Sequence, residues 1–248
     1  MAVARKHDLL VIEDTAQACG GSYKGKILGS FGDVGCVSLQ QFKVITAGEG
    51  GMIVTNRREV FERAAIRHDS AMCFWKPDDT TVQPFPGENF RLNEMEGALG
   101  CVQFGRMAGI LARTRAIKRR IAEAVAGVPG IRLHQAPCPD GDCGLAFSFF
   151  LDTSDGAKRF AEALRAEGVP GGSMYDQGIP DRHIYRYWEY VMDKLSSDAH
   201  GRPWTSPLHD GSRRYTQDMC PRTLEILGRT VTWKTVTVLL RGRKSPEP

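Results

Sequence analysis

The stretch Leu9-Leu-Val-Ile-Glu-Asp14 constrains the fold of this chain more than any other part of the sequence. A short, continuous apolar run that ends in carboxylates is typical of a strand buried on both faces of a parallel sheet. We therefore predict such a strand over residues 8–12, at the start of an α/β domain. Ligands of parallel sheets bind beyond the carboxyl ends of the strands, where Asp14 would lie.

Lys43 is the second informative residue. It lies between apolar neighbours, just before the glycine-rich turn Gly48–Gly51, which is an unusual place for a surface cation. Such surroundings suit a desolvated amine that reacts with a carbonyl group. With Asp14 holding a pyridinium nitrogen, the pair indicates pyridoxal phosphate (PLP) chemistry. The alternative is a lysine whose stem lies along apolar surface while its amine reaches water.

The periodicity of the remaining chain predicts further elements of both kinds. Strands are predicted over 34–40, 52–55, 146–151 and 231–240, and helices over 57–68, 93–128 and 154–167. Gly105 and Gly109 weaken the long helix, and Gly130 is placed to cap it. Residues 70–90 are predicted to form a long loop of the kind found at active sites or interfaces. Residues 171–211 are predicted to form an irregular region that faces the substrate.

Composition excludes several functional classes. A chain of 248 residues with 42% hydrophobic and 25% charged residues is an ordinary globular protein that can bury a core. Its net charge of +4 is too mild to indicate a nucleic-acid partner. There is no apolar run of membrane-spanning length and no signal-peptide pattern, because residues 1–8 lead directly into the first strand. We therefore expect no membrane span and a cytoplasmic location.

The seven cysteines are odd in number and scattered along the chain. This pattern indicates reduced, mostly buried thiols in a cytoplasmic protein. Cys138 and Cys143 are close in sequence, but no matching pair of Cys or His follows at zinc spacing, so we expect no metal site.

Five motifs occur in the order and at the spacing of one known family. They are Val11–Ala18 (VIEDTAQA), Gly29–Gly35 (GSFGDVG), Ser38 five residues before Lys43, Gly48–Gly51 (GEGG) and Gly87–Glu94 (GENFRLNE). On these motifs the chain resembles the DegT/StrS family of sugar aminotransferases, which are PLP enzymes of fold type I. The resemblance covers residues 1 to 230 and matches the C-terminal part of family members.

The resemblance implies a fold and an activity. The fold is α/β: an incomplete fold-type-I large domain over 1–105, a connecting helix over 106–130 and a small α+β domain over 131–248. The activity is PLP-dependent transamination of a keto sugar or keto cyclitol, with glutamate or glutamine as amino donor. Family members with histidine in place of the lysine catalyse dehydration, so Lys43 favours transamination.

The resemblance also implies roles for individual residues. Lys43 would bind the cofactor and move the proton, and Asp14 would hold the ring nitrogen; these two are the catalytic residues. Gln17 would support the ring and Ser38 would bind phosphate. Asn89 would reach the phosphate of the neighbouring subunit, which implies a homodimer. A turn-capping carboxylate is the alternative for Asp14, and an ordinary strand serine the alternative for Ser38.

Four further residues are weaker candidates. Arg91 would position its loop or bind a substrate carboxylate. His183, Tyr185 and Arg186 fall where family members place either substrate-contacting or packing residues, and both readings stay open. The glycines at 29, 32 and 35 are not a dinucleotide fingerprint, because a strand follows them where a helix is needed. They are predicted to be turn residues.

Family members carry a long segment before the strand that bears the aspartate. The resemblance places the main phosphate-binding turn and a ring-stacking aromatic residue in that segment. Only residues 1–13 precede Asp14 here, so an exposed parallel strand edge is expected. Two alternatives to an enzyme active alone follow: a non-catalytic truncated homologue, and one subunit of a split enzyme that needs a complementing N-terminal half.

Overall fold

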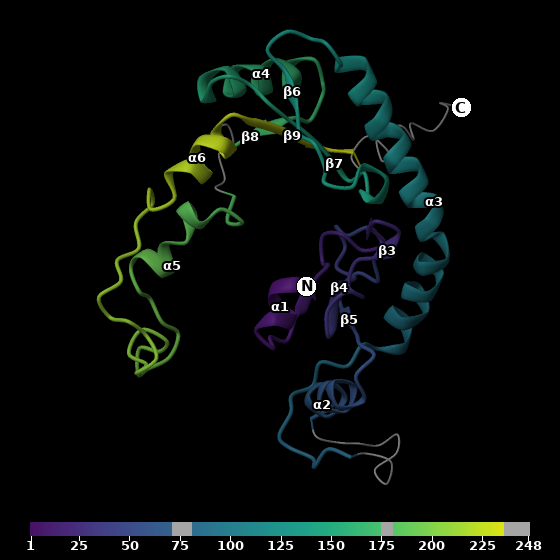
Figure 1. Ribbon diagram of the computed structural model, residues 1–248, viewed down its shortest axis with the longest axis vertical. Coiled ribbons are helices and arrows are strands. Elements are labelled where there is room, and N and C mark those ends of the chain that lie inside the picture. The colour runs from purple at the N-terminus through teal and green to yellow at the C-terminus, as the bar shows by residue number, and fades with distance from the viewer. Residues whose placement is uncertain (71–80, 175–180, 236–248) are drawn as a thin grey trace. The chain divides into compact units, whose positions relative to one another are not determined.

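The computed structural model describes residues 1–70, 81–174 and 181–235 (Figure 1). They form two compact units, Met1–Arg120 with Gln135–Leu145, and Ile121–His134 with the residues from Ala146 onward. The boundary falls within the long helix α3 (Glu94–Val125). These units reflect compactness alone, so the three-part domain division given above stays a prediction.

A three-stranded mixed sheet is the central element of the first unit (Figure 1). Its order is β1 (Ile12–Asp14), β4 (Val34–Ser38) and β5 (Gly51–Val54). β1 runs parallel to β4 with Asp14 opposite Cys36, and β5 runs antiparallel to β4. Parallel pairing brings the carboxyl ends of β1 and β4 to the same edge of the sheet. The unit also contains α1 (Ala2–Lys6), the β2 (Ser22–Tyr23) and β3 (Lys26–Ile27) hairpin, α2 (Arg58–His68) and the 3₁₀ turn η2 (Pro139–Gly141).

The main core of this unit is built around the loop that follows β4. Four residues of that loop are buried together with three from elsewhere in the unit: Leu39, Val44, Ile45, Ala47, Cys19, Leu111 and Cys143. The segment after η2 is fastened to α3, because Arg115 Nε donates to the Asp142 carbonyl at 2.6 Å and Lys118 pairs with the Asp142 carboxylate at 2.9 Å. The buried residues of the loop that bears Lys43 share one apolar core with Leu111 of α3.

The start of the chain differs from its prediction. Helix α1 precedes the first strand, and that strand covers Ile12–Asp14 instead of residues 8–12. Burial on both faces was also wrong, since Leu10 is 73% exposed and Ile12 is 70% exposed. The reason is that β1 lies at the edge of its sheet, with β4 as its only strand partner among the described residues.

The other elements of the first unit lie close to their predicted ranges. The structure has 34–38 and 51–54 for the next two strands, 58–68 for the first long helix and 94–125 for the second. Gly29 has a positive φ and lies in a turn, and Gly32 lies in the bend that follows it. The same prediction was wrong for Gly35, which lies within β4 and pairs with Glu13 of β1. Residues 71–80 of the predicted long loop lie outside the described residues.

The second unit is an antiparallel sheet with helices. The sheet has the order β6 (Arg132–Leu133), β7 (Ala146–Phe150), β9 (Thr230–Lys234) and β8 (Gly172–Ser173). Helix α4 (Ser154–Ala166) is preceded by its N-cap residue Thr153, whose hydroxyl accepts a hydrogen bond from Gly156 N at 3.0 Å. Further helical elements are η3 (Tyr185–Tyr187), α5 (Glu189–Met192) and α6 (Pro221–Gly228). Residues 236–240 of the predicted last strand lie outside the described residues.

Alternating buried side chains of the paired strands β7 and β9 form the core of the second unit. Phe147 and Phe149 of β7 and Val231 and Trp233 of β9 are buried with two alanines of α4. The rings of Phe147 and Trp233 lie 4.9 Å apart between centroids. Because successive side chains of a strand point to opposite faces, every second residue contributes to this core.

The cysteines are less buried than predicted. Of those described, Cys19 and Cys143 are buried, whereas the others are half-buried or exposed. Burial raises the pKa of both buried thiols, and that of Cys143 reaches about 11. They therefore stay protonated and act as small apolar side chains of the core. Within the described ranges, no helix is both long enough and apolar enough to cross a membrane.

Candidate active site

Asp14 ends β1 at the sheet edge where ligands of parallel sheets bind. Its Oδ1 accepts a hydrogen bond from Ala16 N at 3.0 Å, which fixes the carboxylate in a local turn. The next residue, Thr15, is buried and donates from both its backbone N and its Oγ1 to the Cys36 carbonyl, at 2.9 and 2.8 Å. The end of β1 is thus tied to β4, while Asp14 itself is exposed. Gln17, three residues later, is exposed as well.

Ser38 ends β4 at the same edge. Its Oγ accepts a hydrogen bond from Gln40 N at 3.3 Å, so its own proton can be donated to another group. Ser38 also lies opposite Gly51 in β5, which places the hydroxyl at the point where the chain leaves the sheet.

Lys43 lies in the loop between β4 and β5, and this loop is closed on itself. Its base is held because Ala47 N and Thr46 Oγ1 both donate to the Leu39 carbonyl, at 2.9 and 3.0 Å. A tight turn brings Lys43 N to the Gln40 carbonyl at 3.0 Å. Lys43 is half-buried, followed by the buried Val44 and Ile45. No described residue forms a hydrogen bond or ion pair with its amine.

Glu13 has a role that sequence reasoning missed. Its Oε1 accepts hydrogen bonds from Phe31 N at 2.6 Å and Gly32 N at 2.7 Å, and its Oε2 accepts from Gly29 N at 2.8 Å. Partial burial by itself would raise the pKa of Glu13, but the bonds from Gly32, Gly29 and Phe31 outweigh it and lower the pKa. The turn over residues 29–32 is thus fastened to β1 beside Asp14. The signal in the sequence was a second carboxylate directly before Asp14.

Asn89 and Arg91 belong to residues 81–91, which we call the Asn89 arm. The Asn89 side chain is exposed, and its Oδ1 accepts from Arg91 N at 3.2 Å. With the oxygen engaged, the NH₂ group can donate to an anion. Arg91 forms an ion pair with the buried Asp69. This contact favours the loop-positioning role over the binding of a substrate carboxylate.

The remaining candidates lie in the second unit. His183 is exposed and its Nδ1 lies 2.7 Å from Asp181 Oδ1. The Tyr185 hydroxyl accepts a hydrogen bond from Cys220 N at 2.9 Å. This bond lies within the second unit and favours a structural role for Tyr185. Arg186 is half-buried. Roles for the three in substrate binding stay a prediction.

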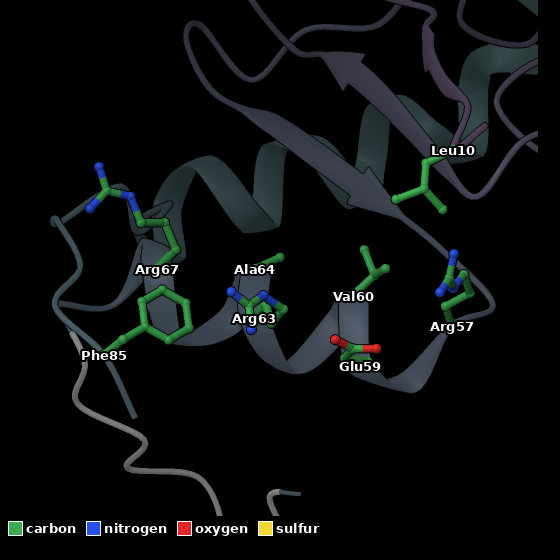
Figure 2. Close-up of a pocket in the computed structure, with 8 residues that line it drawn as sticks. All are labelled: Leu10, Arg57, Glu59, Val60, Arg63, Ala64, Arg67 and Phe85. Carbon is green, nitrogen blue, oxygen red and sulfur yellow. The ribbon is translucent and has the colours of Figure 1, made fainter. Parts of the chain in front are cut away.

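The structure also contains an open hollow of about 530 Å³ on the first unit. Figure 2 shows that it is lined mainly by one face of α2, with Leu10 and Phe85 beside it. Its lining residues are Leu10, Arg57, Glu59, Val60, Arg63, Ala64, Arg67 and Phe85. None of the predicted site residues is among them, so the hollow is separate from the candidate site.

Asp14 and Ser38 therefore end paired parallel strands at one edge of the sheet, and Gln17 and Lys43 lie in the segments that follow these strands. Residues 1–219 match the model of the DegT/DnrJ/EryC1/StrS aminotransferase family. The chain belongs to this family. DegT-family enzymes use PLP and act on sugars or cyclitols, and this confirms the resemblance recognised in the motifs.

Two curated relatives illustrate the similarity. The UDP-N-acetyl-3-dehydro-alpha-D-glucosamine 3-aminotransferase of Acidithiobacillus ferrooxidans is 35% identical over 71% of this chain and 45% of its own length. The L-glutamine:2-deoxy-scyllo-inosose aminotransferase of Streptoalloteichus tenebrarius is 37% identical over 49% of this chain and 30% of its own length. The chain thus spans less than half the length of these DegT-family relatives.

A solved structure shows the fold. Helicobacter pylori PseC, an aminotransferase involved in the biosynthesis of pseudaminic acid, matches with a TM-score of 0.67 and 22% identity. The match covers 93% of this chain and 55% of PseC. The described elements therefore have the fold of the DegT-family aminotransferases over part of the length of such an enzyme.

The donor set at the sheet edge fits PLP in part. Asp14 offers the carboxylate that a ring nitrogen needs, and Lys43 an amine without a described partner. Ser38 offers a hydroxyl proton, and Asn89 offers amide protons for a phosphate. These residues suit the ring and one side of a phosphate group.

Proposed function

We propose that this chain carries the catalytic residues of a PLP-dependent aminotransferase that acts on a keto sugar or keto cyclitol. The observation that carries the proposal is the parallel pairing of β1 with β4. It brings Asp14, at the end of β1, to the edge from which the loop of Lys43 departs. The two curated relatives act on a nucleotide-linked keto sugar and on a keto cyclitol, and the name of one specifies glutamine. Glutamate or glutamine is the amino donor that we propose here.

PLP, when bound, supplies the electron sink for a carbon that loses a proton. Lys43 would take and return that proton at its Nζ, because it is half-buried next to the buried Val44 and its amine has no partner among the described residues. The Asp14 carboxylate holds the ring-nitrogen proton. Gln17 supports the ring, Ser38 donates its hydroxyl proton to the phosphate, and Asn89 donates from a second copy of the chain in a homodimer.

The second candidate is one subunit of an enzyme that is completed by another polypeptide. The open edge of β1 favours it, since Leu9, Leu10 and Ile12 are all more than half exposed. A strand added there would pair the edge and cover these side chains. In this case the residues at the sheet edge keep their roles, but the chain alone binds PLP weakly or not at all. A non-catalytic homologue would bind none even with its partner.

The test is a titration of the purified chain with PLP, followed by absorbance. Borohydride reduction and peptide mapping then locate the labelled lysine. We expect saturable binding with the label on Lys43, loss of the label in Lys43→Ala, and an unchanged label in the control Lys158→Ala, which alters an exposed lysine of α4. Label spread over surface lysines would contradict the proposal for the chain alone. The titration would then be repeated with a complementing N-terminal half.

A further inference from the structure

The Asn89 arm contains no helix and no strand, yet it is fixed along the C-terminal end of α2. Glu88 N donates to the Arg67 carbonyl at 2.8 Å and Phe90 N to the His68 carbonyl at 2.9 Å. Carbonyls in the last turn of a helix have no partner within the helix, so the arm supplies the donors that they need. Ser70 N returns a bond to the Glu88 carbonyl at 3.2 Å.

A buried carboxylate holds each end of the arm. At its start, Glu62 is 2% exposed and accepts from Thr81 N at 2.9 Å, Thr81 Oγ1 at 2.7 Å and Val82 N at 3.1 Å. Arg58, one turn earlier in α2, pairs with the same carboxylate at 2.5 Å. A buried charge is tolerated only when it is paired and hydrogen-bonded, and the bonds to Thr81 and Val82 meet that condition.

At the other end, Asp69 is 2% exposed and pairs with Arg91. Asp69 is the C-cap residue of α2, where the helix dipole disfavours a negative charge. Its carboxylate therefore depends on the Arg91 guanidinium. Removing one partner of such a pair leaves an uncompensated charge, so the pair ties the arm firmly to the helix.

Between these ends, the backbone approaches too closely for a side chain. A Cβ at Gly87 would lie 2.6 Å from the Arg67 carbonyl oxygen and 2.7 Å from that of Ile66. Nearby, the Arg63 guanidinium lies 5.2 Å from the centre of the Phe85 ring, as Figure 2 lets the reader follow. The arm thus contacts α2 or its C-cap at its start, at Phe85 and Gly87, and at its end.

We propose that Glu62 and Asp69 are positioning residues for Asn89, and that they present its amide NH₂ group at a fixed place as a donor to phosphate. The inference rests on the proposed function, in which Asn89 binds the phosphate of PLP. In both pairs the acid is buried and the arginine is about half exposed or more. Pairing a buried charge costs desolvation and adds little stability, whereas it can select one arrangement of a segment. Two buried acids match that use, because the arm contains no helix or strand and only a single β-bridge, between Asp69 and Asn89, is found along its described residues.

The experiment measures two quantities in the full chain. One is the dissociation constant for PLP, and the other is the hydrogen-exchange rate of the arm amides Glu88 and Phe90. The variants are Asp69→Asn, Glu62→Gln and Arg91→Gln. The control Glu88→Gln alters an exposed ion pair with Arg67 on the same arm, and such pairs contribute little.

We expect each of the three variants to weaken PLP binding by about tenfold and to speed exchange of the arm amides. Glu88→Gln should change the dissociation constant by less than about twofold. Arg91→Lys, which keeps the charge, should recover most of the affinity lost in Arg91→Gln. Exchange of the β7 amides in the second unit shows whether each variant is folded. Should Asp69→Asn fail to fold, the comparison of Arg91→Gln with Arg91→Lys decides.

Asn89→Ala separates the two possible failures. If it leaves the PLP dissociation constant unchanged, the phosphate role of Asn89 is wrong and the inference fails with it. If Asn89→Ala weakens binding while Asp69→Asn, Glu62→Gln and Arg91→Gln do not, the inference alone is overturned. The same holds if the arm amides exchange as slowly in these variants as in the unaltered chain.

Discussion

At the scale of single residues, the adjacent acids Glu13 and Asp14 have different roles. Glu13 and Asp14 alternate in β1, so their side chains lie on opposite faces of the strand. The Glu13 carboxylate accepts hydrogen bonds from three backbone N–H groups, and both of its oxygens are used in these bonds. Asp14 uses one oxygen for a local turn and is exposed. One acid therefore holds the strand end in place, and the other can bind a ligand.

Replacing Glu13 by Gln tests this division. The amide keeps one acceptor oxygen but puts an NH₂ group against a backbone donor, so we expect a loss of about 1–3 kcal/mol in the free energy of unfolding. Urea denaturation measures it. Glu162→Gln, on an exposed position of α4, is the control and should change stability little. Equal stability of the Glu13 and Glu162 variants would contradict the role given to Glu13.

Glu62 predicts a particular dependence of stability on pH. Hydrogen bonds from Arg58 and then Thr81 lower its pKa from 4.5 to about 2 in the folded chain. A group whose pKa is lowered by folding stabilises the folded state above its unfolded pKa, and this contribution is lost as the pH falls through the folded value. Stability should therefore drop between pH 4.5 and about 2.

Chemical denaturation across that pH range, compared with Glu62→Gln, measures the Glu62 contribution. The variant should show a smaller drop than the unaltered chain, and Glu162→Gln should show the same drop as the unaltered chain. A drop that is identical in all three chains would contradict the assignment.

At the scale of elements, sequence periodicity located α2, α3 and α4 to within a few residues. Their apolar spacing is local information, which a pattern can carry. The motifs likewise predicted roles for Asp14 and Lys43, and these roles stay predictions. What escaped prediction depends on contacts between distant residues, such as Glu13 with Gly32 and Asp69 with Arg91. The edge position of β1 escaped for the same reason, since no local pattern distinguishes an exposed strand from a covered one.

Helix α3 offers a test of local propensity at this scale. Gly105 and Gly109 lie within it, and a Cβ at either position would meet no atom within 4 Å. We expect Gly105→Ala and Gly109→Ala each to stabilise the chain by about 0.5–1 kcal/mol, because alanine loses less backbone entropy in a helix. Thermal denaturation measures the change. The reverse replacement at an exposed position of the same helix, Ala112→Gly, should destabilise the chain by a similar amount. A gain in stability in Ala112→Gly would contradict the argument.

At the scale of the whole molecule, the chain exposes much apolar surface. On the first unit this surface includes Leu10 and Ile12 at the β1 edge and Ile53 and Val54 in β5. Unpaired strand edges and contiguous apolar patches promote association. The purified chain should therefore associate increasingly as its concentration rises.

A charge on the strand edge should weaken that association. We expect Ile12→Lys to shift the onset of association to a higher concentration, because a lysine on an edge strand opposes pairing with another chain. Sedimentation velocity over a dilution series measures it. Leu208→Lys is the matched control, since Leu208 is 97% exposed but lies in the second unit. An equal effect of both replacements would mean that general charge, and not the edge, sets the association.

The pairing of β1 with β4 also limits how the gene can change in length. Loss or gain of one codon between Val11 and Asp14 would turn each later side chain of the strand to the other face and exchange the places of the two acids. The tip of the β2–β3 hairpin is less restricted, because nothing lies within 4 Å of a Cβ at Gly25 and added residues there would leave the face of each β1 side chain unchanged. Descendants of this sequence should therefore vary in length at the hairpin tip, while codon number along the strand stays constant.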